Sequence, residues 1–151
     1  MNCLFCDKPL KSWRNKYCNN ICQKDHEYKE YINAWKDGKV NGMRGKFQVS
    51  NHIKKYLFEK YDNKCSKCGW WERNKFTNVI PLEIEHIDGN YLNNIESNLL
   101  LLCPNCHSLT STYKGANKGN GRKDRSKYNL YGNPELGLKP SVETLYDGPK
   151  F

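Results

Sequence analysis

The stretch that decides the fold is residues 83–107, which read EIEHIDGNYLNNIESNLLLLCPNCH. A glutamate directly precedes a histidine at Glu85-His86, and Asn98 precedes a run of four leucines. A Cys-Pro-Asn-Cys knuckle follows the leucines, and His107 comes directly after its second cysteine. Each residue type is common by itself, but their order and spacing together call for one explanation.

Hydrophobic periodicity predicts two strands and a helix in this stretch. Over residues 81–87 the pattern alternates, with Glu83 and Glu85 on one side and His86 on the other, which is strand spacing. The Asp-Gly-Asn turn signal at 88–90 and the apolar run at 99–102 predict a loop and a second, buried strand. Pro104 suits the first position of a helix, which we expect to continue to about residue 113.

Cysteine usage predicts two structural metal sites. The chain has 151 residues and a mean hydropathy of −0.93, so it can bury only small cores, which usually need metals or disulfides as staples. All eight cysteines fall in pairs separated by two or three residues. A disulfide framework is the alternative, but residues 1–3 leave no room for a signal peptide and no long apolar segment follows, so we expect zinc and a reducing cytoplasm. Each of the two Zn²⁺ ions would take four thiolates, from Cys3, Cys6, Cys18 and Cys22 and from Cys65, Cys68, Cys103 and Cys106.

Composition divides the chain into four parts of a small, zinc-stabilised α+β protein. Residues 1–36 predict a four-cysteine zinc finger whose second cysteine pair opens a helix, a plan that resembles a small treble clef. Residues 37–50 contain three glycines and predict a linker. Residues 51–113 begin with a helix to about residue 61 and hold the second cysteine set with the 83–107 stretch. Residues 114–151 combine glycine, asparagine, proline and basic residues, which predicts an irregular basic tail.

The charge favours a polyanionic partner. The net charge is +9 and the pI is near 9.1. An acidic membrane surface is one candidate, but no basic amphipathic helix is visible, so we expect nucleic acid and no membrane. The N-terminal finger has two possible roles, DNA binding or only the folding of the N-terminal part, and the sequence leaves both open. The side chains expected to contact DNA are Lys11, Arg14, Lys16, Arg44, Lys46, Lys118, Arg122 and Lys123.

The polar residues of the central stretch can hold a second kind of metal. A zinc ion with four thiolate ligands is closed and offers no open position, so chemistry needs other ligands. Glu85 offers a hard oxygen and His107 a nitrogen, which leaves positions on Mg²⁺ or Mn²⁺ for water and a phosphate oxygen. His86 suits a general base, with an unperturbed pKa of about 6.5. Asn98 would accept a hydrogen bond from that ring or brace the loop between the strands. Taken singly, each of these residues also has a plain structural explanation.

Taken together, these residues resemble a known family. His86, Asn98 and His107, with the phrases KCSKCGW, HIDGN and NLLLLCPNCHSLT, look like the His-Asn-His core of the HNH endonucleases, in the zinc-clipped branch common among phage-encoded and mobile enzymes. The resemblance covers residues 50–122 well and the N-terminal finger more loosely. It implies the ββα-metal fold, His86 as general base, Glu85 and His107 as ligands of the divalent ion, and Asn98 as the asparagine that orients the base. Many members carry aspartate at the position of Glu85, so ligation here is either direct or through water.

We therefore expect a DNA endonuclease that hydrolyses phosphodiester bonds of double-stranded DNA with one divalent ion, in the cytoplasm of a bacterial host if the chain is phage-encoded. A non-catalytic, zinc-dependent DNA-binding protein is the alternative, and a nuclease or binding protein directed at RNA is a third hypothesis. The sequence contains no dimer motif, and we make no prediction of the oligomeric state.

Overall fold

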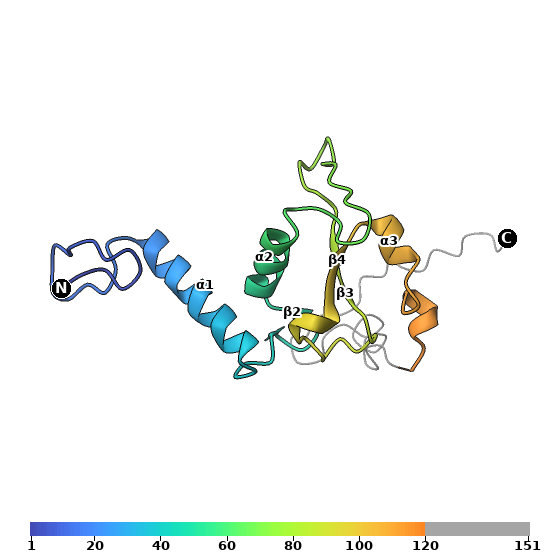
Figure 1. Cartoon of the computed structure of the whole chain (residues 1–151), viewed down its shortest axis with the longest axis horizontal. Coiled ribbons are helices and arrows are strands. Elements are labelled where there is room, and N and C mark those ends of the chain that lie inside the picture. Colours follow the sequence, from blue (N-terminus) through green and yellow to red (C-terminus); the bar gives the residue numbers. More distant parts are fainter. Residues whose placement is uncertain (120–151) are drawn as a thin grey trace, which may run out of the picture.

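The computed structural model describes residues 1–119, so most of the tail expected at 114–151 lies outside the described residues. The described part is a small α+β protein with two two-stranded antiparallel sheets, in which the first helix extends away from the central strands toward the N-terminus (Figure 1). None of its helices is long and apolar enough to cross a membrane. Its elements are α1 (Asn20–Lys36), β1 (Met43–Arg44), β2 (Gln48–Val49), α2 (Asn51–Lys60), β3 (Glu83–His86), η1 (Glu96–Asn98), β4 (Leu99–Leu102), α3 (Pro104–Ser108) and η2 (Lys114–Asn117).

The order strand, loop, strand, helix is present in the central stretch. Strands β3 and β4 pair antiparallel, with Glu85 opposite Leu100, and β4 has the predicted bounds. Strand β3 is shorter than the alternation over 81–87 predicts. The prediction of a helix to residue 113 was wrong, because α3 ends at Ser108. The backbone N–H and hydroxyl of Thr110 both bond the carbonyl of His107, at 3.1 and 2.9 Å, and turn the chain there.

Helices α1 and α2 begin where the sequence predicts. The side chain of Asn19 accepts a 2.8 Å hydrogen bond from the backbone N–H of Cys22, and Ser50 caps α2 in the same way. The two helices pack on each other and on one end of β4. This cluster buries Ile32, Trp35, Ile53, Leu57 and Leu99.

A second core lies under the other end of the β3–β4 sheet and includes the second cysteine set. It buries Cys65, Ile80, Leu82, Leu101, Leu102, Cys103 and Cys106. Neither core is large, as the low hydropathy predicts. Thiols therefore form part of the packing at the point where β4 passes into α3.

The segment expected as a linker at 37–50 contains a short hairpin. Strands β1 and β2 pair antiparallel, with Met43 opposite Val49. Gly42 precedes the hairpin with φ +73°, and a Cβ there would lie 2.6 Å from the side chain of Ile53. The glycine is therefore a packing requirement and not only a flexible joint.

The two CxxC knuckles have the same backbone plan. In the first, the N–H of Asp7 bonds the carbonyl of Cys3 at 3.0 Å, and in the second the N–H of Gly69 bonds that of Cys65 at 2.8 Å. Both Asp7 and Gly69 have positive φ, 58° and 75°. In each set the second cysteine pair spans the first residues of a helix, α1 or α3.

Candidate active site and metal centres

Each cysteine set brings four sulfur atoms together. Within each set one ligand atom per residue lies within 4.8 Å of the others. The Cys18–Cys22 sulfur distance is 3.3 Å and the Cys68–Cys103 distance is 3.7 Å. Sulfurs on a tetrahedral zinc, with Zn–S of about 2.3 Å, lie about 3.8 Å apart. Both sets therefore fit a structural zinc, as the sequence predicts.

The electrostatics of these thiols favour a bound cation. A hydrogen bond from the backbone of Cys6 is the main cause that lowers the pKa of Cys3 to about 6. Burial raises the pKa of Cys65, but backbone hydrogen bonds, first from Cys103, lower it to about 6 overall. Hydrogen bonding to Cys68 is the largest cause that raises the pKa of Cys106 to about 12. Backbone N–H groups thus favour the thiolate form of Cys3 and Cys65, while a neighbouring thiol such as Cys106 resists losing its proton beside that negative charge. A bound divalent cation removes this repulsion and allows all four cysteines to be thiolates.

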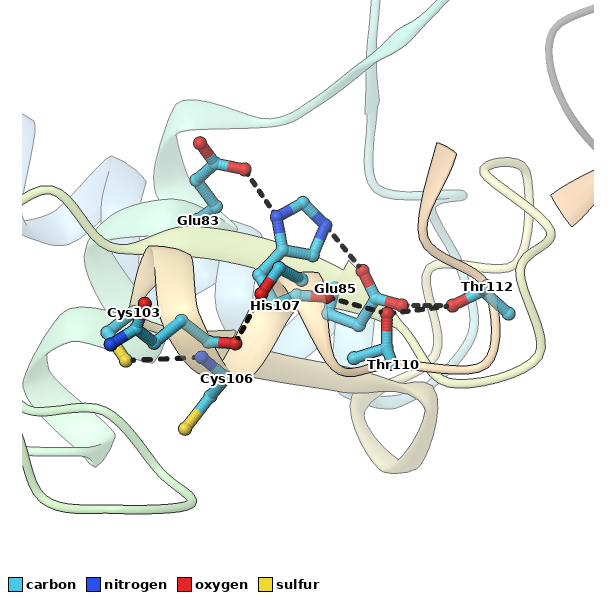
Figure 2. Close-up of polar contacts among 9 residues, drawn as sticks. Glu83, Glu85, Cys103, Cys106, His107, Thr110 and Thr112 are labelled. Carbon is cyan, nitrogen blue, oxygen red and sulfur yellow. Dashed lines mark hydrogen bonds and ion pairs between the residues drawn. The ribbon is translucent and has the colours of Figure 1, made fainter. Parts of the chain in front are cut away.

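His107 lies between two carboxylates of β3 (Figure 2). Its Nδ1 is 2.6 Å from Oε2 of Glu83, and its Nε2 is 2.9 Å from Oε2 of Glu85. The exposed fraction of the side chain is 58% for Glu83 but 10% for Glu85. The ring edge-stacks against Tyr113, with centroids 5.3 Å apart.

The local folding of the chain accounts for this arrangement. Glu83 and Glu85 are two residues apart on β3, so they share a face of the strand. His107 directly follows Cys106, so the second cysteine set fixes α3, and with it the ring, next to that face. The hydroxyl of Thr112 donates a hydrogen bond to Oε1 of Glu85, which leaves Oε2 facing the imidazole.

The same atoms fit an octahedral divalent ion. Adjacent ligands on such an ion, each at about 2.1 Å, lie about 3.0 Å apart. The observed 2.9 Å between Nε2 of His107 and Oε2 of Glu85 is a hydrogen-bond distance, and it is close enough to that separation for both atoms to bind one ion with little movement. A histidine that binds a metal usually donates its other ring N–H to a carboxylate, which is the position of Glu83. The donor set therefore fits a metal with oxygen and nitrogen ligands.

These side chains line a pocket of about 400 Å³. It is open to solvent and mostly polar, and His86 lines it together with the metal-ligand candidates. Lys114 adds a positive charge to the wall. The lining residues are Glu83, Ile84, Glu85, His86, Gly89, Tyr91, His107, Thr112, Lys114 and Asn117.

The described hydrogen bonds of the Asn98 side chain go to the loop after β3 and not to the ring of His86. Its side chain accepts from the N–H of Asp88 at 3.0 Å and donates to Asp88 Oδ1 and to the carbonyl of Asn93, both at 2.8 Å. These contacts agree with the loop-bracing role expected for Asn98, which stays a prediction. The ring contact is made by Asn94, whose Oδ1 lies 2.8 Å from Nε2 of His86.

The basic residues expected to contact DNA are spread over the surface. Lys11, Arg14 and Lys16 are exposed on the N-terminal finger, where the Arg14 guanidinium lies 5.4 Å from the centroid of the Trp13 ring. Arg44 is exposed on β1 and donates to Asn51 at 3.1 Å. Lys46 and Lys118 are also exposed, whereas Arg122 and Lys123 lie outside the described residues.

The sequence pattern did not predict four residues that the structure places at the site, namely Glu83, Asn94, Thr112 and Lys114. The strand alternation did place Glu83 beside Glu85, and the spacing of two residues was the available signal. Thr112 lies in a turn and Lys114 in the short helix η2, and both line the pocket, whereas Asn94 is a buried loop residue that contacts the ring of His86. No periodic pattern marks these three positions in the sequence.

One curated protein is similar to part of the chain. Over 60 residues, 38% of the chain, the sequence is 52% identical to the H-N-H endonuclease F-TflIV of Escherichia phage T5. The match covers 24% of that relative, so the chain spans about a quarter of its length. No protein-family model matches the chain, and no solved structure matches it. The resemblance to HNH endonucleases is thus confirmed over the matched residues.

Proposed function

We propose that this chain is a DNA endonuclease that hydrolyses phosphodiester bonds with one divalent metal ion and a histidine general base. One observation carries the proposal: Nε2 of His107 and Oε2 of Glu85 lie 2.9 Å apart in a pocket that His86 also lines. The similarity of part of the chain to a phage H-N-H endonuclease supports the same activity.

In this proposal Glu85 and His107 hold the divalent ion, Mg²⁺ or Mn²⁺. When bound, such an ion neutralises charge on the phosphate and stabilises the leaving oxygen. Glu83 holds Nδ1 of His107, so the ring presents Nε2 to the pocket. Thr112 fixes the carboxylate of Glu85 through its other oxygen. Lys114 supplies a positive charge for a phosphate at the pocket wall.

His86 would take the proton from the attacking water. Its ring lines the pocket, and the hydrogen bond described for it goes to Asn94 and not to Glu85 or His107, so the ring can act on an atom other than the metal ion. A general base of this type contributes about 10²- to 10⁴-fold to the rate. Asn98 supports the base indirectly, because it holds the loop that follows β3.

The fold proposed for this activity is the ββα-metal unit, made of β3, β4 and α3 and clipped by the second zinc. The N-terminal four-cysteine unit would be a treble-clef-like finger. We propose that double-stranded DNA lies across the pocket and is contacted by the exposed basic residues of the finger, of β1 and of the chain after α3. Both zinc ions would be structural, since four thiolates leave no open position.

Nicking of supercoiled plasmid tests the proposal. The purified protein is incubated with Mg²⁺, Mn²⁺, Ca²⁺ or EDTA, and the parent is compared with His86→Ala and with the control variant His52→Ala. His52 lies on α2 and packs against the ring of Tyr31, so its loss should leave cleavage intact. We expect cleavage with Mg²⁺ or Mn²⁺ that His86→Ala abolishes.

Two outcomes would replace the proposal. DNA binding without cleavage in every ion would favour the non-catalytic DNA-binding protein. Faster cutting of single-stranded RNA than of duplex DNA would favour an RNA-directed nuclease. Equal cutting by His86→Ala and the parent would remove His86 from its proposed role.

A further inference from the structure

The hydrogen bond between His86 and Asn94 defines which ring nitrogen carries the proton. The amide nitrogen of Asn94 faces three acceptors: the carbonyl of Asn41 at 3.3 Å, Sδ of Met43 at 2.9 Å and the carbonyl of Leu92 at 3.4 Å. The other amide atom, which faces His86, is therefore the oxygen. An amide oxygen only accepts, so Nε2 of His86 must donate across the 2.8 Å contact.

Asn94 is itself held from the N-terminal side of the chain. Its exposed fraction is 3%, and its backbone carbonyl accepts a 2.6 Å hydrogen bond from the indole N–H of Trp35. Trp35 lies near the end of α1, and Asn41 and Met43 belong to the segment that connects α1 to α2. Three of the partners of Asn94, namely Trp35, Asn41 and Met43, thus come from a part of the chain that precedes the ββα unit, while Leu92 and His86 belong to that unit.

Close packing leaves Asn94 little room to move. A Cβ on Gly42 would lie 3.0 Å from Cβ of Asn94 and 3.2 Å from the indole nitrogen of Trp35. The Trp35 ring also packs edge-on against Tyr56 of α2, with centroids 5.6 Å apart. Backbone, indole and amide therefore form one tightly packed group behind His86.

We propose that Asn94 is the positioning residue for His86 and that α1 and residues 41–43 hold Asn94 in place. The imidazole is fixed as its Nε2–H tautomer, and Nδ1 is the nitrogen left to accept a proton. The segment before α2 is therefore an integral part of the catalytic site and not only a tether for the finger. This inference rests on the proposed function for its effect on cleavage, but its effect on the ring does not depend on cleavage.

The tautomer is measured directly by two-bond ¹H–¹⁵N spectra of the histidine rings in the zinc-loaded, full-length protein. The chain has four histidines, and the His86 signals are assigned from their loss in His86→Gln. We expect the parent to show His86 as the Nε2–H tautomer. In Asn94→Ala, which removes the acceptor oxygen opposite Nε2, we expect mixed tautomers.

The contribution of α1 is tested by Trp35→Phe, which removes the indole N–H and keeps an aromatic ring. The matched control is Tyr56→Phe, which removes a 2.6 Å hydrogen bond to Glu96 from the same cluster but has no bond to Asn94. Trp35→Phe should shift the His86 ring signals and lower kcat by about 10-fold with little change in KM, since misplacement of a reacting group costs rate. Tyr56→Phe should change neither.

The outcomes separate the two proposals. If Asn94→Ala and Trp35→Phe, both folded with two zinc ions per chain, leave the His86 tautomer and kcat as in the parent, the positioning role is overturned. If the tautomer changes as expected but the parent cleaves no nucleic acid, the positioning stands and the proposed function fails. A parent protein whose His86 is the Nδ1–H tautomer would overturn the inference by itself.

Discussion

Nδ1 of His107 lies 2.6 Å from Oε2 of Glu83, on the side of the ring opposite to Glu85. The glutamate is more than half exposed, yet it determines the direction in which the ring presents its other nitrogen. A carboxylate behind a metal-binding histidine fixes the ring and strengthens the ligand. Glu83 should therefore influence metal affinity without touching the ion.

Replacement of Glu83 by alanine is expected to weaken Mn²⁺ binding about 10- to 100-fold, the usual cost of losing a partner behind a ligand. Binding is measured by calorimetry or by Mn²⁺ electron paramagnetic resonance on the zinc-loaded protein without DNA. Glu85→Ala should abolish the same binding, because it removes a proposed ligand. Glu72→Ala is the control, since Glu72 is an exposed carboxylate outside the pocket.

If Glu83→Ala binds Mn²⁺ as tightly as the parent, the 2.6 Å contact between Glu83 and His107 is an ion pair that does not contribute to metal binding. An equal loss in Glu72→Ala would show that the affinity reflects general charge and not a built site.

Zinc stoichiometry provides a second test. We expect two zinc ions per chain, falling to one in Cys3→Ser and to one in Cys65→Ser. The two variants should differ in folding, because the binding energy of a structural zinc, about 10–16 kcal/mol, rivals the whole stability of a small domain. Cys65 lies in the core beneath β3 and β4, so its loss should unfold the ββα unit, whereas loss of Cys3 should unfold only the finger.

Metal analysis and circular dichroism measure both effects. Disulfides in protein purified without reductant, with no bound zinc, would contradict the assignment. A Cys65→Ser variant with two zinc ions and full nicking activity would do so as well.

Loss of the Asn98 side chain should act mainly on stability. Its amide makes three hydrogen bonds to the loop after β3, and its exposed fraction is only 6%. Asn98→Ala leaves Asp88 and Asn93 without these partners and should lower the free energy of unfolding by about 2–3 kcal/mol. Urea unfolding at a fixed zinc concentration measures the change. Asn105→Ala, at an exposed position of α3, should stay within about 0.5 kcal/mol of the parent.

If Asn98→Ala is as stable as the parent but cleaves slowly, Asn98 acts on the reaction more directly than its contacts indicate. The comparison with Asn94→Ala then separates the asparagine that holds the loop from the one that holds the ring.

Local signals in the sequence predicted much of the fold. The starts of α1 and α2, the four leucines of β4 and the two cysteine sets are each determined by residues close together in the chain. Alternation likewise placed Glu83 and Glu85 on one face of β3. These features depend on helix, strand and zinc geometry, which short spacings reveal.

The group behind His86 could not be predicted in this way. Trp35 and Asn94 are 59 positions apart, and their hydrogen bond forms only after α1 and α2 have packed on β4. Glycines at 37–50 indicated a linker, yet Gly42 is there because the packed side chains leave no space for a Cβ. Similarly, the helix predicted to residue 113 ends early because Thr110 bonds the carbonyl of His107, a side-chain effect that periodicity does not register.

The N-terminal finger presents a cluster of exposed basic residues around an exposed tryptophan. Lys11, Arg14 and Lys16 are exposed, and the exposed fraction of Trp13 is 75%. If this face contacts DNA, its charges displace counterions from phosphates, and binding should then depend steeply on salt. If the finger is only a structural staple, the same charges should matter little.

Replacement of Lys11, Arg14 and Lys16 by glutamine is therefore expected to lower duplex DNA affinity. The slope of log K against log salt should fall by up to about 0.9 for each phosphate that the variant no longer neutralises. Fluorescence anisotropy at about 50 to 200 mM salt measures the slope. The matched control replaces Lys39, Lys55 and Lys64, which removes the same charge from lysines that already pair with aspartates. Equal slopes in the two variants would assign the effect to net charge, and a finger variant that binds like the parent would leave the finger a structural role only.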